Sequence, residues 1–279
     1  MRLIDGRAIA AAISEVVAIA AAALRETGVA PTLAVVVPTA DEATAWYVRS
    51  IQRAAGKVGI DCRVDQLDSP SGADIVRRLG DLSDDEGVHG IICQTPLPAG
   101  VRLDEVGAYI TPHKDVDGAN PTSLGRLATG LPTFAPATAV AVLEILRREE
   151  VPLLGTRTVV VGRSTVVGKP AALLLLAEHA TVTVCHSRTV DLPGVCADAD
   201  VLVAAVGRIH LIGADYVKKG AVIIDVGTNP TPDGGLAGDV DPDAVADRAG
   251  ALTPVPGGVG PVTTALLLRH TVAAAAGRS

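Results

Sequence analysis

Short apolar runs alternate with segments of helical periodicity along most of the chain. Apolar runs of a few residues between turn signals are typical of buried strands, whereas apolar positions three and four residues apart are typical of helices. The pattern predicts strands at 32–37, 62–67, 89–93, 157–161, 181–185, 201–205 and 221–226. It predicts helices at 6–26, 43–58, 74–82, 136–149, 169–178 and 262–275. This alternation indicates an α/β fold with parallel sheets.

The first helix raises the question of a membrane or signal segment, because residues 8–24 are strongly apolar. Asp5 precedes this run, Glu15 interrupts it, and alanine dominates it. These features favour an amphipathic first helix, with Ile9, Ile13, Val16 and Leu24 on one face, and no membrane partner.

Composition narrows the function classes. The chain has 279 residues, which is enough for one large domain or two ordinary ones. A net charge of −7 argues against a general nucleic-acid surface. The four cysteines have no metal-ligand spacing, so we expect no metal site and a cytoplasmic location. Aromatic residues make up only 2% of the chain, so the adjacent pair Trp46-Tyr47 stands out.

The segment Gly162–Pro170 follows the apolar run 158–161 and precedes a helix-forming run. A strand, a glycine turn and a helix N-terminus together suit the binding of a phosphate. The spacing Gly-x-Ser-x-x-x-Gly differs from the general dinucleotide fingerprint, however. From these residues alone, nucleotide binding and an ordinary strand-to-helix turn remain equally acceptable.

Other loops suggest how the chain is divided. Residues 111–121 are turn-rich and charged, as expected of a domain boundary. The loops 185–189 and 226–229 follow predicted strands of the second half, beside the Gly162 turn. Ligands of parallel sheets bind at this carboxyl edge. Residues 253–261 form a further loop that is rich in glycine and proline.

Taken together, these segments resemble the methylenetetrahydrofolate dehydrogenase/cyclohydrolase (FolD) family over nearly the whole chain. The motifs that carry the resemblance are Tyr47-Val48, Gln94–Pro98, Lys114–Gly118, Gly162–Pro170, Cys185–Thr189, Asp225-Val226-Gly227 and Pro254–Pro261. The resemblance implies two α/β domains flanking a cleft, the second a Rossmann-like parallel-sheet domain that binds NADP. It implies a folate domain at 1–118, rejoined by the last helix at 262–279, and a cofactor domain at 119–261. It also implies a homodimer held through the cofactor domains.

The resemblance further implies roles for individual residues on the cofactor side. The matching cofactor-binding positions are Gly162, Arg163, Ser164, Ser187 and Thr228. Arg163 and Ser187 favour NADP over NAD, because a dianionic 2′-phosphate needs several donors. The alternative for Arg163 is an ordinary surface salt bridge.

On the substrate side, the matching substrate-binding positions are Tyr47, Gln94, Asp117, Gly257 and Gly258, and the resemblance implies that the first three are also catalytic. The resemblance implies that Tyr47 stacks on the folate, Gln94 orients the reactive centre, and Asp117 pairs with the pterin edge. A carboxylate suits that edge because it accepts two parallel hydrogen bonds. The alternatives are a core tyrosine on an amphipathic helix and a turn aspartate before Gly118. Asp115 is expected to be structural.

The chain departs from the family pattern where a catalytic lysine is usual. The family has Tyr-Val-x-x-Lys, and here the last position is Ile51. Ile51 could line the cleft or face the core, and the helical register favours the cleft. The segment 136–141 and Thr95 also differ from the family pattern.

The missing lysine leads to an asymmetric functional expectation. Hydride transfer from 5,10-methylenetetrahydrofolate to the nicotinamide needs alignment, but no proton transfer by the protein. Addition of water to the methenyl product needs a titratable group, which isoleucine cannot supply. The chain is therefore expected to be an NADP-dependent oxidoreductase of one-carbon metabolism, with cyclohydrolase activity weak or lost. The alternatives are the full bifunctional activity with another group in place of lysine, a paralogue acting on a related one-carbon or specialised substrate, and a catalytically silent NADP- or folate-binding protein.

Overall fold

The computed structural model describes residues 1–277, and the chain divides into two compact units. One contains residues 11–137 and the chain from Thr264 onward, and we call it the three-stranded unit after its sheet. The other contains residues 1–10 and 138–263, and we call it the six-stranded unit. Residues 1–10 and 119–137 thus fall on the other side of the expected division at 118/119. Residues 278–279 of the expected last segment lie outside the described residues.

The three-stranded unit is built on a parallel sheet with strand order β3-β2-β4. Its strands are β2 (Thr32–Val37), β3 (Asp61–Gln66) and β4 (Gly90–Cys93). Its main helices are α2 (Glu42–Lys57), α3 (Gly72–Asp84) and α5 (Pro121–Ala128), with the short α4 (Leu103–Val106) and η1 (Gly107–Tyr109). The strands and the first two helices lie where the sequence predicts them.

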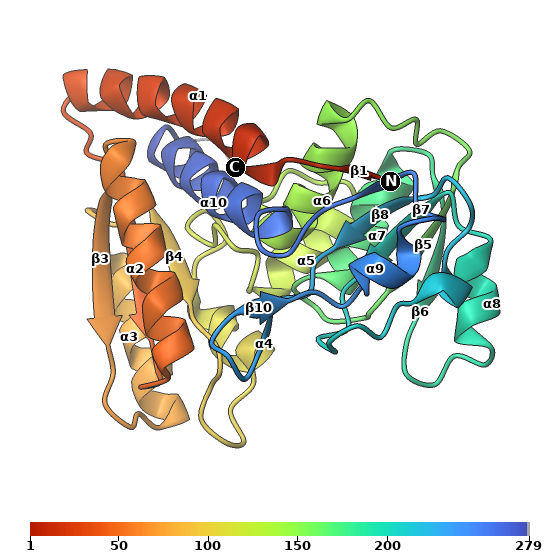
Figure 1. Cartoon of the computed structure of the whole chain (residues 1–279). Helices are drawn as coiled ribbons and strands as arrows, with labels where there is room; N and C mark the ends of the chain where they lie inside the picture. The colour runs from red at the N-terminus through yellow and green to blue at the C-terminus, as the bar shows by residue number, and fades with distance from the viewer. Residues whose placement is uncertain (278–279) are drawn as a thin grey trace. The chain divides into compact units, whose positions relative to one another are not determined.

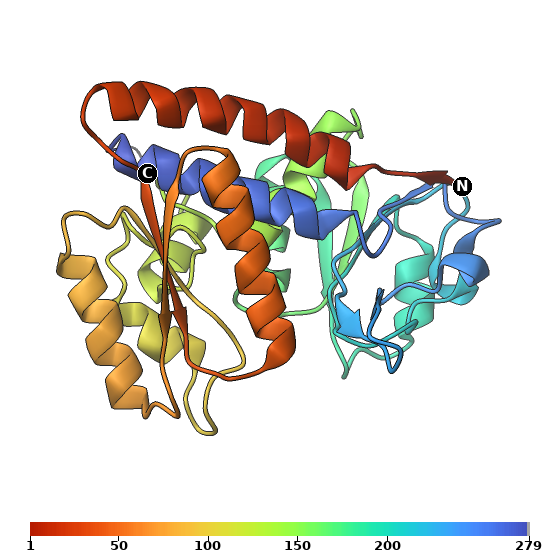
Figure 2. The same cartoon turned by 60° about the vertical axis from the view of Figure 1, so that its left-hand side comes forward.

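The central strand β2 is buried along its whole length, as expected of a strand covered on both faces. Figure 2 shows α2 and α3 on opposite faces of this sheet. The α3 face packs an aliphatic core that includes Ala34, Ile75, Leu79 and Ile91. Asp115 extends the β4 edge of the sheet through a parallel bridge to Ile91, which places the next residues beside the end of β4.

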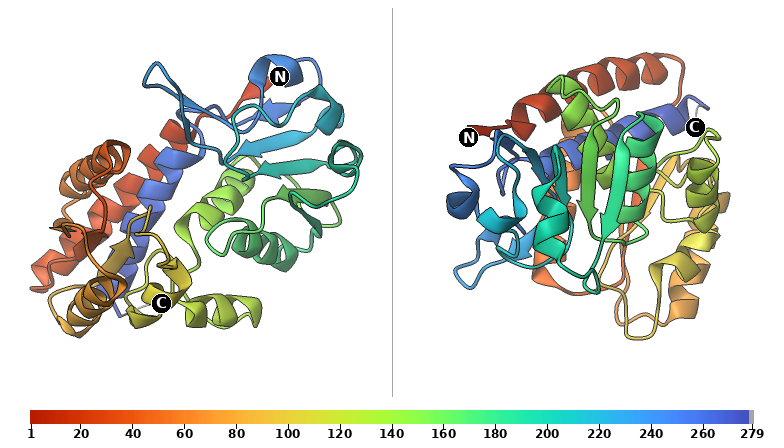
Figure 3. Two further views of the ribbon diagram at one scale, coloured as in Figure 1. Left: turned by 90° about the horizontal axis from the view of Figure 1, so that it is seen from below. Right: turned by 90° about the vertical axis from the view of Figure 1, so that its right-hand side faces the viewer.

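The six-stranded unit has an all-parallel sheet in the order β1-β11-β8-β7-β5-β6 (Figure 1). Its strands are β1 (Arg2–Leu3), β5 (Arg157–Val161), β6 (Thr181–Cys185), β7 (Val201–Ala204), β8 (Val222–Asp225) and β11 (Ala251–Leu252). Its shorter elements are α7 (Gly168–Ala177), α8 (Leu192–Ala197), η2 (Ala214–Tyr216), α9 (Pro242–Val245) and the hairpin β9 (Asn229–Pro230) with β10 (Leu236–Ala237). Figure 3 gives two further views of this sheet and its helices.

The core of the six-stranded unit is aliphatic, in keeping with the scarcity of aromatic residues. Leu202, Ile212 and Ile223 are among the buried members of one continuous cluster. Because the strands are parallel, the loops after β5, β6, β7 and β8 leave the sheet at one edge. This edge carries every cofactor residue that the sequence predicts.

Three helices continue from one unit into the other: α1 (Gly6–Glu26), α6 (Ala137–Arg148) and α10 (Val259–Ala275). By length and composition alone α1 could cross a membrane. Its positions Ile9, Ile13, Val17 and Ala21 are buried at intervals of four residues, which is the pattern of a helix packed on a protein core. The predicted face was wrong at Val16, which is 62% exposed.

Candidate active site

The turn after β5 can be built only with glycine. Gly162 has a φ of +133°, and a Cβ atom there would lie 2.2 Å from the carbonyl oxygen of Ala205. A Cβ atom on Gly168 would lie 2.2 Å from the carbonyl oxygen of Gly162. Ser164 Oγ accepts hydrogen bonds from the N–H groups of Val167 and Gly168, at 3.1 and 3.3 Å. The Ser164 hydroxyl therefore satisfies the N–H groups of Val167 and Gly168 at the start of α7, and its own proton stays available for a ligand.

Two exposed arginines lie on the loops at this edge. Arg163 follows Gly162, and Arg188 follows Ser187 in the loop after β6. That loop is a tight turn in which Thr189 N donates to His186 O at 2.9 Å, with the exposed Ser187 between them. Within residues 1–277 neither arginine has a carboxylate at ion-pair distance. The alternative interpretation, in which Arg163 forms a surface salt bridge, is therefore not supported. Both guanidinium groups are open to an anionic ligand.

A pair of buried carboxylates shapes the loops after β7 and β8. Asp239 accepts hydrogen bonds from the N–H groups of Val206, Gly207 and Arg208 and from the Asn229 side chain, at 2.6 to 3.1 Å. Asp225 accepts hydrogen bonds from the N–H groups of Gly227, Asp239 and Val240, at 2.9 to 3.0 Å.

Burial raises the pKa of Asp225 to about 6, against the lowering effect of its three N–H donors. Thr228 stands exposed between Gly227 and Asn229, both of which these carboxylates hold. The position of Thr228 is thus fixed by its neighbours.

The glycine-rich loop before α10 is compact. A Cβ atom on Gly258 would lie 2.6 Å from Pro254 O, and one on Gly6 would lie 1.8 Å from Gly258 O. Gly257, with a φ of +110°, lies beside the Arg7 side chain. Gly258 is buried and Gly257 is half-buried, so Gly257 offers the more accessible backbone of the two.

In the three-stranded unit, a hydrogen bond ties the start of α2 to the loop after β4. Thr44 Oγ1 donates to Thr95 O at 3.2 Å, next to Gln94, and Asp41 caps α2 by accepting from Thr44 N at 2.8 Å. Both Gln94 and Tyr47 are half-buried. Burial raises the pKa of the Tyr47 phenol, the nearby Asp117 carboxylate raises it further, and a hydrogen bond with Thr264 opposes both. Tyr47 and Asp117 therefore lie close enough to interact.

The two aspartates of the 114–118 motif have different surroundings. Asp115 is fully buried and accepts from Ala119 N, Asn120 N and Ser123 Oγ, at 2.8, 2.9 and 2.6 Å. This confirms the structural role expected of it. Asp117 is partly exposed, and among residues 1–277 its carboxylate accepts a single long hydrogen bond, from Ala137 N at 3.3 Å.

Burial, with a smaller contribution from Asp115, raises the pKa of Asp117 to about 7. A carboxylate with so few partners retains acceptor capacity for a ligand.

The side chain of Ile51 has no exposed surface. The expectation that it lines the wall of a cleft was therefore wrong. On α2 it shares the buried face with Val48 and Ala55, at offsets of three and four residues, whereas Tyr47 lies on the flank of that face. Amphipathic packing of the helix accounts for an apolar residue at this position.

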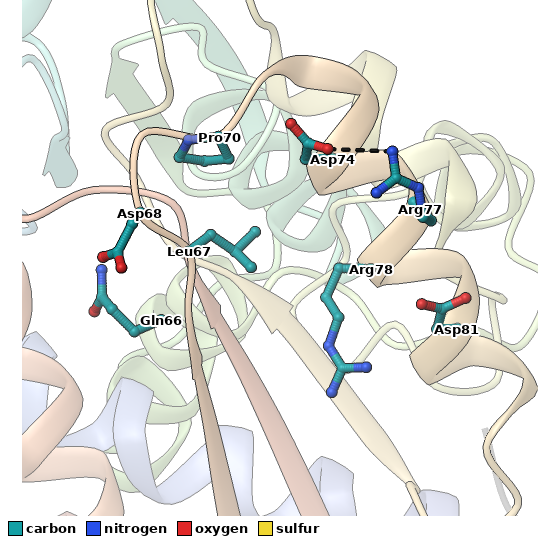
Figure 4. A pocket seen from close by; sticks show the side chains of 8 residues that line it. All are labelled: Gln66, Leu67, Asp68, Pro70, Asp74, Arg77, Arg78 and Asp81. Carbon is teal, nitrogen blue, oxygen red and sulfur yellow. Dashed lines mark ion pairs between the residues drawn. The ribbon is translucent and has the colours of Figure 1, made fainter.

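One pocket among the described residues lies away from these groups. It has a volume of about 350 Å³ and is lined by residues between Gln66 and Asp81, at the end of β3 and the start of α3 (Figure 4). Its two cations are already paired, Arg77 with Asp74 at 3.2 Å and Arg78 with Asp65 at 2.8 Å. No residue predicted for the site lines this pocket.

Comparison with known proteins identifies the family. Residues 4–117 match the profile of the tetrahydrofolate dehydrogenase/cyclohydrolase catalytic domain, and residues 136–279 match that of the corresponding NAD(P)-binding domain. The chain belongs to the tetrahydrofolate dehydrogenase/cyclohydrolase family. It is 64% identical to a bifunctional protein FolD of Parafrankia over 277 residues, which cover 99% of this chain and 100% of that protein.

Solved structures of the family agree with this fold. The bifunctional FolD enzyme of Campylobacter jejuni superposes with a TM-score of 0.95 at 38% identity, over 99% of each chain. The Trypanosoma brucei dehydrogenase-cyclohydrolase, complexed with NADP cofactor and inhibitor, gives 0.93 at 36% identity, over 98% of this chain and 97% of that one. The predictions of two α/β domains, of a Rossmann-like second domain and of NADP as cofactor are confirmed.

The comparisons do not support weak or lost cyclohydrolase activity. The Parafrankia relative, and another that is 58% identical from Saccharopolyspora erythraea, are bifunctional proteins. These matches favour the alternative of full bifunctional activity over the expectation drawn from Ile51. The roles of individual residues stay predictions.

Sequence reasoning missed several residues that shape the site. Arg188 lay inside a quoted motif, and an exposed cation next to Ser187 could have signalled it. Asp239 and His270 gave no such signal, because their partners are distant in sequence: Val206 for Asp239, and Val116, 154 residues away, for His270.

Proposed function

We propose that this protein is a bifunctional enzyme that oxidises 5,10-methylenetetrahydrofolate with NADP and hydrolyses the methenyl product to a formyl derivative. The observation that carries the proposal is the 64% identity to a bifunctional FolD over essentially the whole of both chains. The local geometry of both units supports it.

On the cofactor side, the loops fit a dinucleotide phosphate. Gly162 leaves room where any side chain would collide with Ala205, and the α7 N-terminus follows directly. In this proposal Arg163, Ser187 and the additional Arg188 hold the 2′-phosphate of the adenosine ribose, while Thr228 and Gly257 border the nicotinamide. When bound, NADP would accept a hydride from the methylene carbon of the folate.

On the substrate side, we propose that Tyr47 stacks on the folate, Gln94 orients its reactive centre, and Asp117 accepts hydrogen bonds from the pterin edge. Gly258 completes the wall with its backbone. Pairing with pterin N–H groups requires the ionised form of Asp117, whose pKa is about 7. Folate binding should therefore strengthen as the pH rises through that value.

Hydrolysis requires that protons be moved without a lysine at position 51. Water must add to the methenyl carbon and lose a proton, and the departing nitrogen must gain one. Ile51 is fully buried and cannot take part. In this proposal another group replaces the lysine, and Tyr47 and Asp117 are titratable side chains of the site.

We also propose a homodimer formed through the six-stranded unit. Strand β6 is an edge strand with exposed residues at Thr183 and Val184, and Leu176 of α7 is 58% exposed. An unpaired edge strand with exposed apolar side chains nearby can pair with the same strand of a second copy of the chain. Light scattering on the purified protein should give twice the mass of 28.3 kDa, and a monomer would contradict this part of the proposal. We also propose a cytoplasmic location for the enzyme.

The activity is tested by two reactions on one preparation. Methylenetetrahydrofolate with NADP should produce NADPH, and the rate with NAD should be lower. Methenyltetrahydrofolate supplied alone should be hydrolysed faster than in buffer. NADPH formation without hydrolysis would show that the protein is a monofunctional dehydrogenase. If neither reaction occurs, the protein is a binding protein or acts on a different substrate.

A further inference from the structure

His270 of α10 contacts the turn that carries Asp117. Asp115 to Gly118 form a β-turn in which Gly118 N donates to Asp115 O at 3.2 Å. Val116 and Asp117 are its two central residues, and Gly118 has a φ of +63°. His270 Nδ1 lies 2.8 Å from Val116 O. This carbonyl belongs to the peptide unit that joins Val116 to Asp117.

The protonation of His270 makes it a hydrogen-bond donor at this contact. A carbonyl oxygen can only accept, so Nδ1 carries the proton. The imidazole is 8% exposed, and burial lowers its pKa to about 4, against the raising effect of the Val116 carbonyl. At neutral pH the ring is thus the uncharged Nδ1–H tautomer. The charged groups that act on His270 or on Asp117 are Arg269 and Asp115, and Asp117 in turn raises the pKa of Tyr47 on α2.

The imidazole ring of His270 also lies against a second segment that contacts Asp117. The rings of Phe134 and His270 have centroids 5.1 Å apart and are tilted by 35°. Pro136, two residues after Phe134, packs on Gly118. A Cβ atom built on Gly118 would lie 2.6 Å from the Pro136 ring. Ala137 N then donates to the Asp117 carboxylate. One buried side chain therefore contacts both segments that set the position of this carboxylate.

We propose that His270 is a positioning residue for Asp117, acting as a neutral hydrogen-bond donor that fixes the central peptide of the 115–118 turn. The central peptide of a β-turn can adopt opposite orientations, which distinguish type I from type II turns. A donor at Val116 O selects one orientation and so determines the direction in which the Asp117 side chain leaves the backbone. The consequence for catalysis rests on the proposed function, in which Asp117 binds the pterin.

The test compares three variants. His270→Leu removes the donor and keeps an apolar side chain, so it leaves Val116 O without its partner. It should raise the KM for methylenetetrahydrofolate about tenfold and leave the KM for NADP unchanged. His270→Asn keeps an N–H donor near the position of Nδ1 and should restore most of the loss. Thr271→Val is the matched control and should behave as the wild type, because this buried neighbour donates its hydroxyl hydrogen bond to Leu267 O within the helix.

The kinetic outcome decides the proposal. Equal rises in both KM values, or no change with His270→Leu, would overturn it, because a general loss of structure has no preference for the folate. If His270→Leu does not fold, His270→Gln takes its place. Its amide is displaced by one methylene, and it should give an intermediate rise in the folate KM.

A second measurement does not depend on activity. Carboxyl carbon NMR, with the Asp117 signal assigned through Asp117→Asn, should show titration near pH 7 in the wild type. In His270→Leu the midpoint should fall by about one unit or more toward the ordinary value of about 3.9, as water reaches the loosened turn. An unchanged midpoint would overturn the proposal. This result holds even if the wild type turns over no folate, which would refute the proposed function alone.

Discussion

The two units use buried side chains in different ways to position their candidate ligand residues. In the six-stranded unit, Asp225 and Asp239 gather backbone N–H groups from the loops after β7 and β8. The groups that these two carboxylates bind are largely main-chain N–H groups. In the three-stranded unit, Tyr47, Gln94 and Asp117 are side chains on a helix flank, a strand end and a turn. Contacts from distant segments hold these side chains in place, including His270 of α10 and Ala137 at the start of α6.

The difference determines which amino-acid substitutions should disrupt each site. A loop held by a carboxylate loses several hydrogen bonds when that one acid is changed. A side chain on a packed helix depends on the apolar residues beneath it instead. The following substitutions test this contrast, beginning with the largest expected effect.

Ile51→Lys places an ammonium group in the fully buried position beneath the candidate folate site. Burial disfavours the charged form by several pKa units, so the variant should lose about 4 kcal/mol of unfolding free energy at pH 7. The folded-state pKa of the lysine is lowered. The loss should therefore shrink as the pH rises toward about 10.4, where the unfolded chain also loses the proton. Urea unfolding at two pH values measures this, with Ile51→Met as control. A variant as stable as Ile51→Met would show that position 51 has access to water.

Asp239→Asn should cost about 3 kcal/mol of unfolding free energy, because an amide offers one acceptor oxygen to four donors. NADP binding should weaken as well, since the loops after β7 and β8 lose their common anchor. Asp241→Asn is the control. Asp241 accepts hydrogen bonds from Asp243 N and Ala244 N, which belong to its own helix start at α9. Equal effects of the two substitutions would contradict a special role of Asp239.

Sequence reasoning succeeded where the controlling interactions are local. The apolar runs located the longer strands, and the glycines around 162–168 marked a turn that no other residue could form. It missed β1 and β11, because two-residue strands have no periodicity. It missed α5, although Asn120 followed by Pro121 is a recognisable helix start. It placed Ile51 on the wrong face of α2. The four-residue spacing between Tyr47 and Ile51 fixes the angle between the two side chains around the helix, but it does not tell which side of the helix is buried.

Acidification should lower the stability of the three-stranded unit, because His270 is buried in its neutral form. Its folded-state pKa of about 4 lies below the ordinary value of 6.5, so the unfolded chain takes up a proton first as the pH falls. The wild type should lose about 3 kcal/mol of unfolding free energy between pH 6.5 and 4 through this residue. His270→Asn should lose less than the wild type over the same range. Parallel curves for the two proteins would show that His270 is not buried in its neutral form.

Arg163→Gln should have the smallest effect of these substitutions. It should change only the preference for NADP over NAD. Loss of one charge-assisted hydrogen bond to the 2′-phosphate should reduce the preference for NADP over NAD about tenfold, with little change in stability. Lys219→Gln removes an equal charge at the start of β8, the opposite edge of the sheet, and serves as control. If both variants lose the same preference, the effect is one of general charge and not of a phosphate contact.

The central claim is that this chain hydrolyses methenyltetrahydrofolate although Ile51 stands where the resemblance to the FolD family implies a catalytic lysine. The most direct measurement is the decay of methenyltetrahydrofolate absorbance with purified wild-type protein, compared with buffer and with Ile51→Met. We expect wild type and Ile51→Met to accelerate the decay alike, because residue 51 takes no part in proton transfer. A wild-type rate equal to that of buffer, in a preparation that still reduces NADP with methylenetetrahydrofolate, would contradict the account.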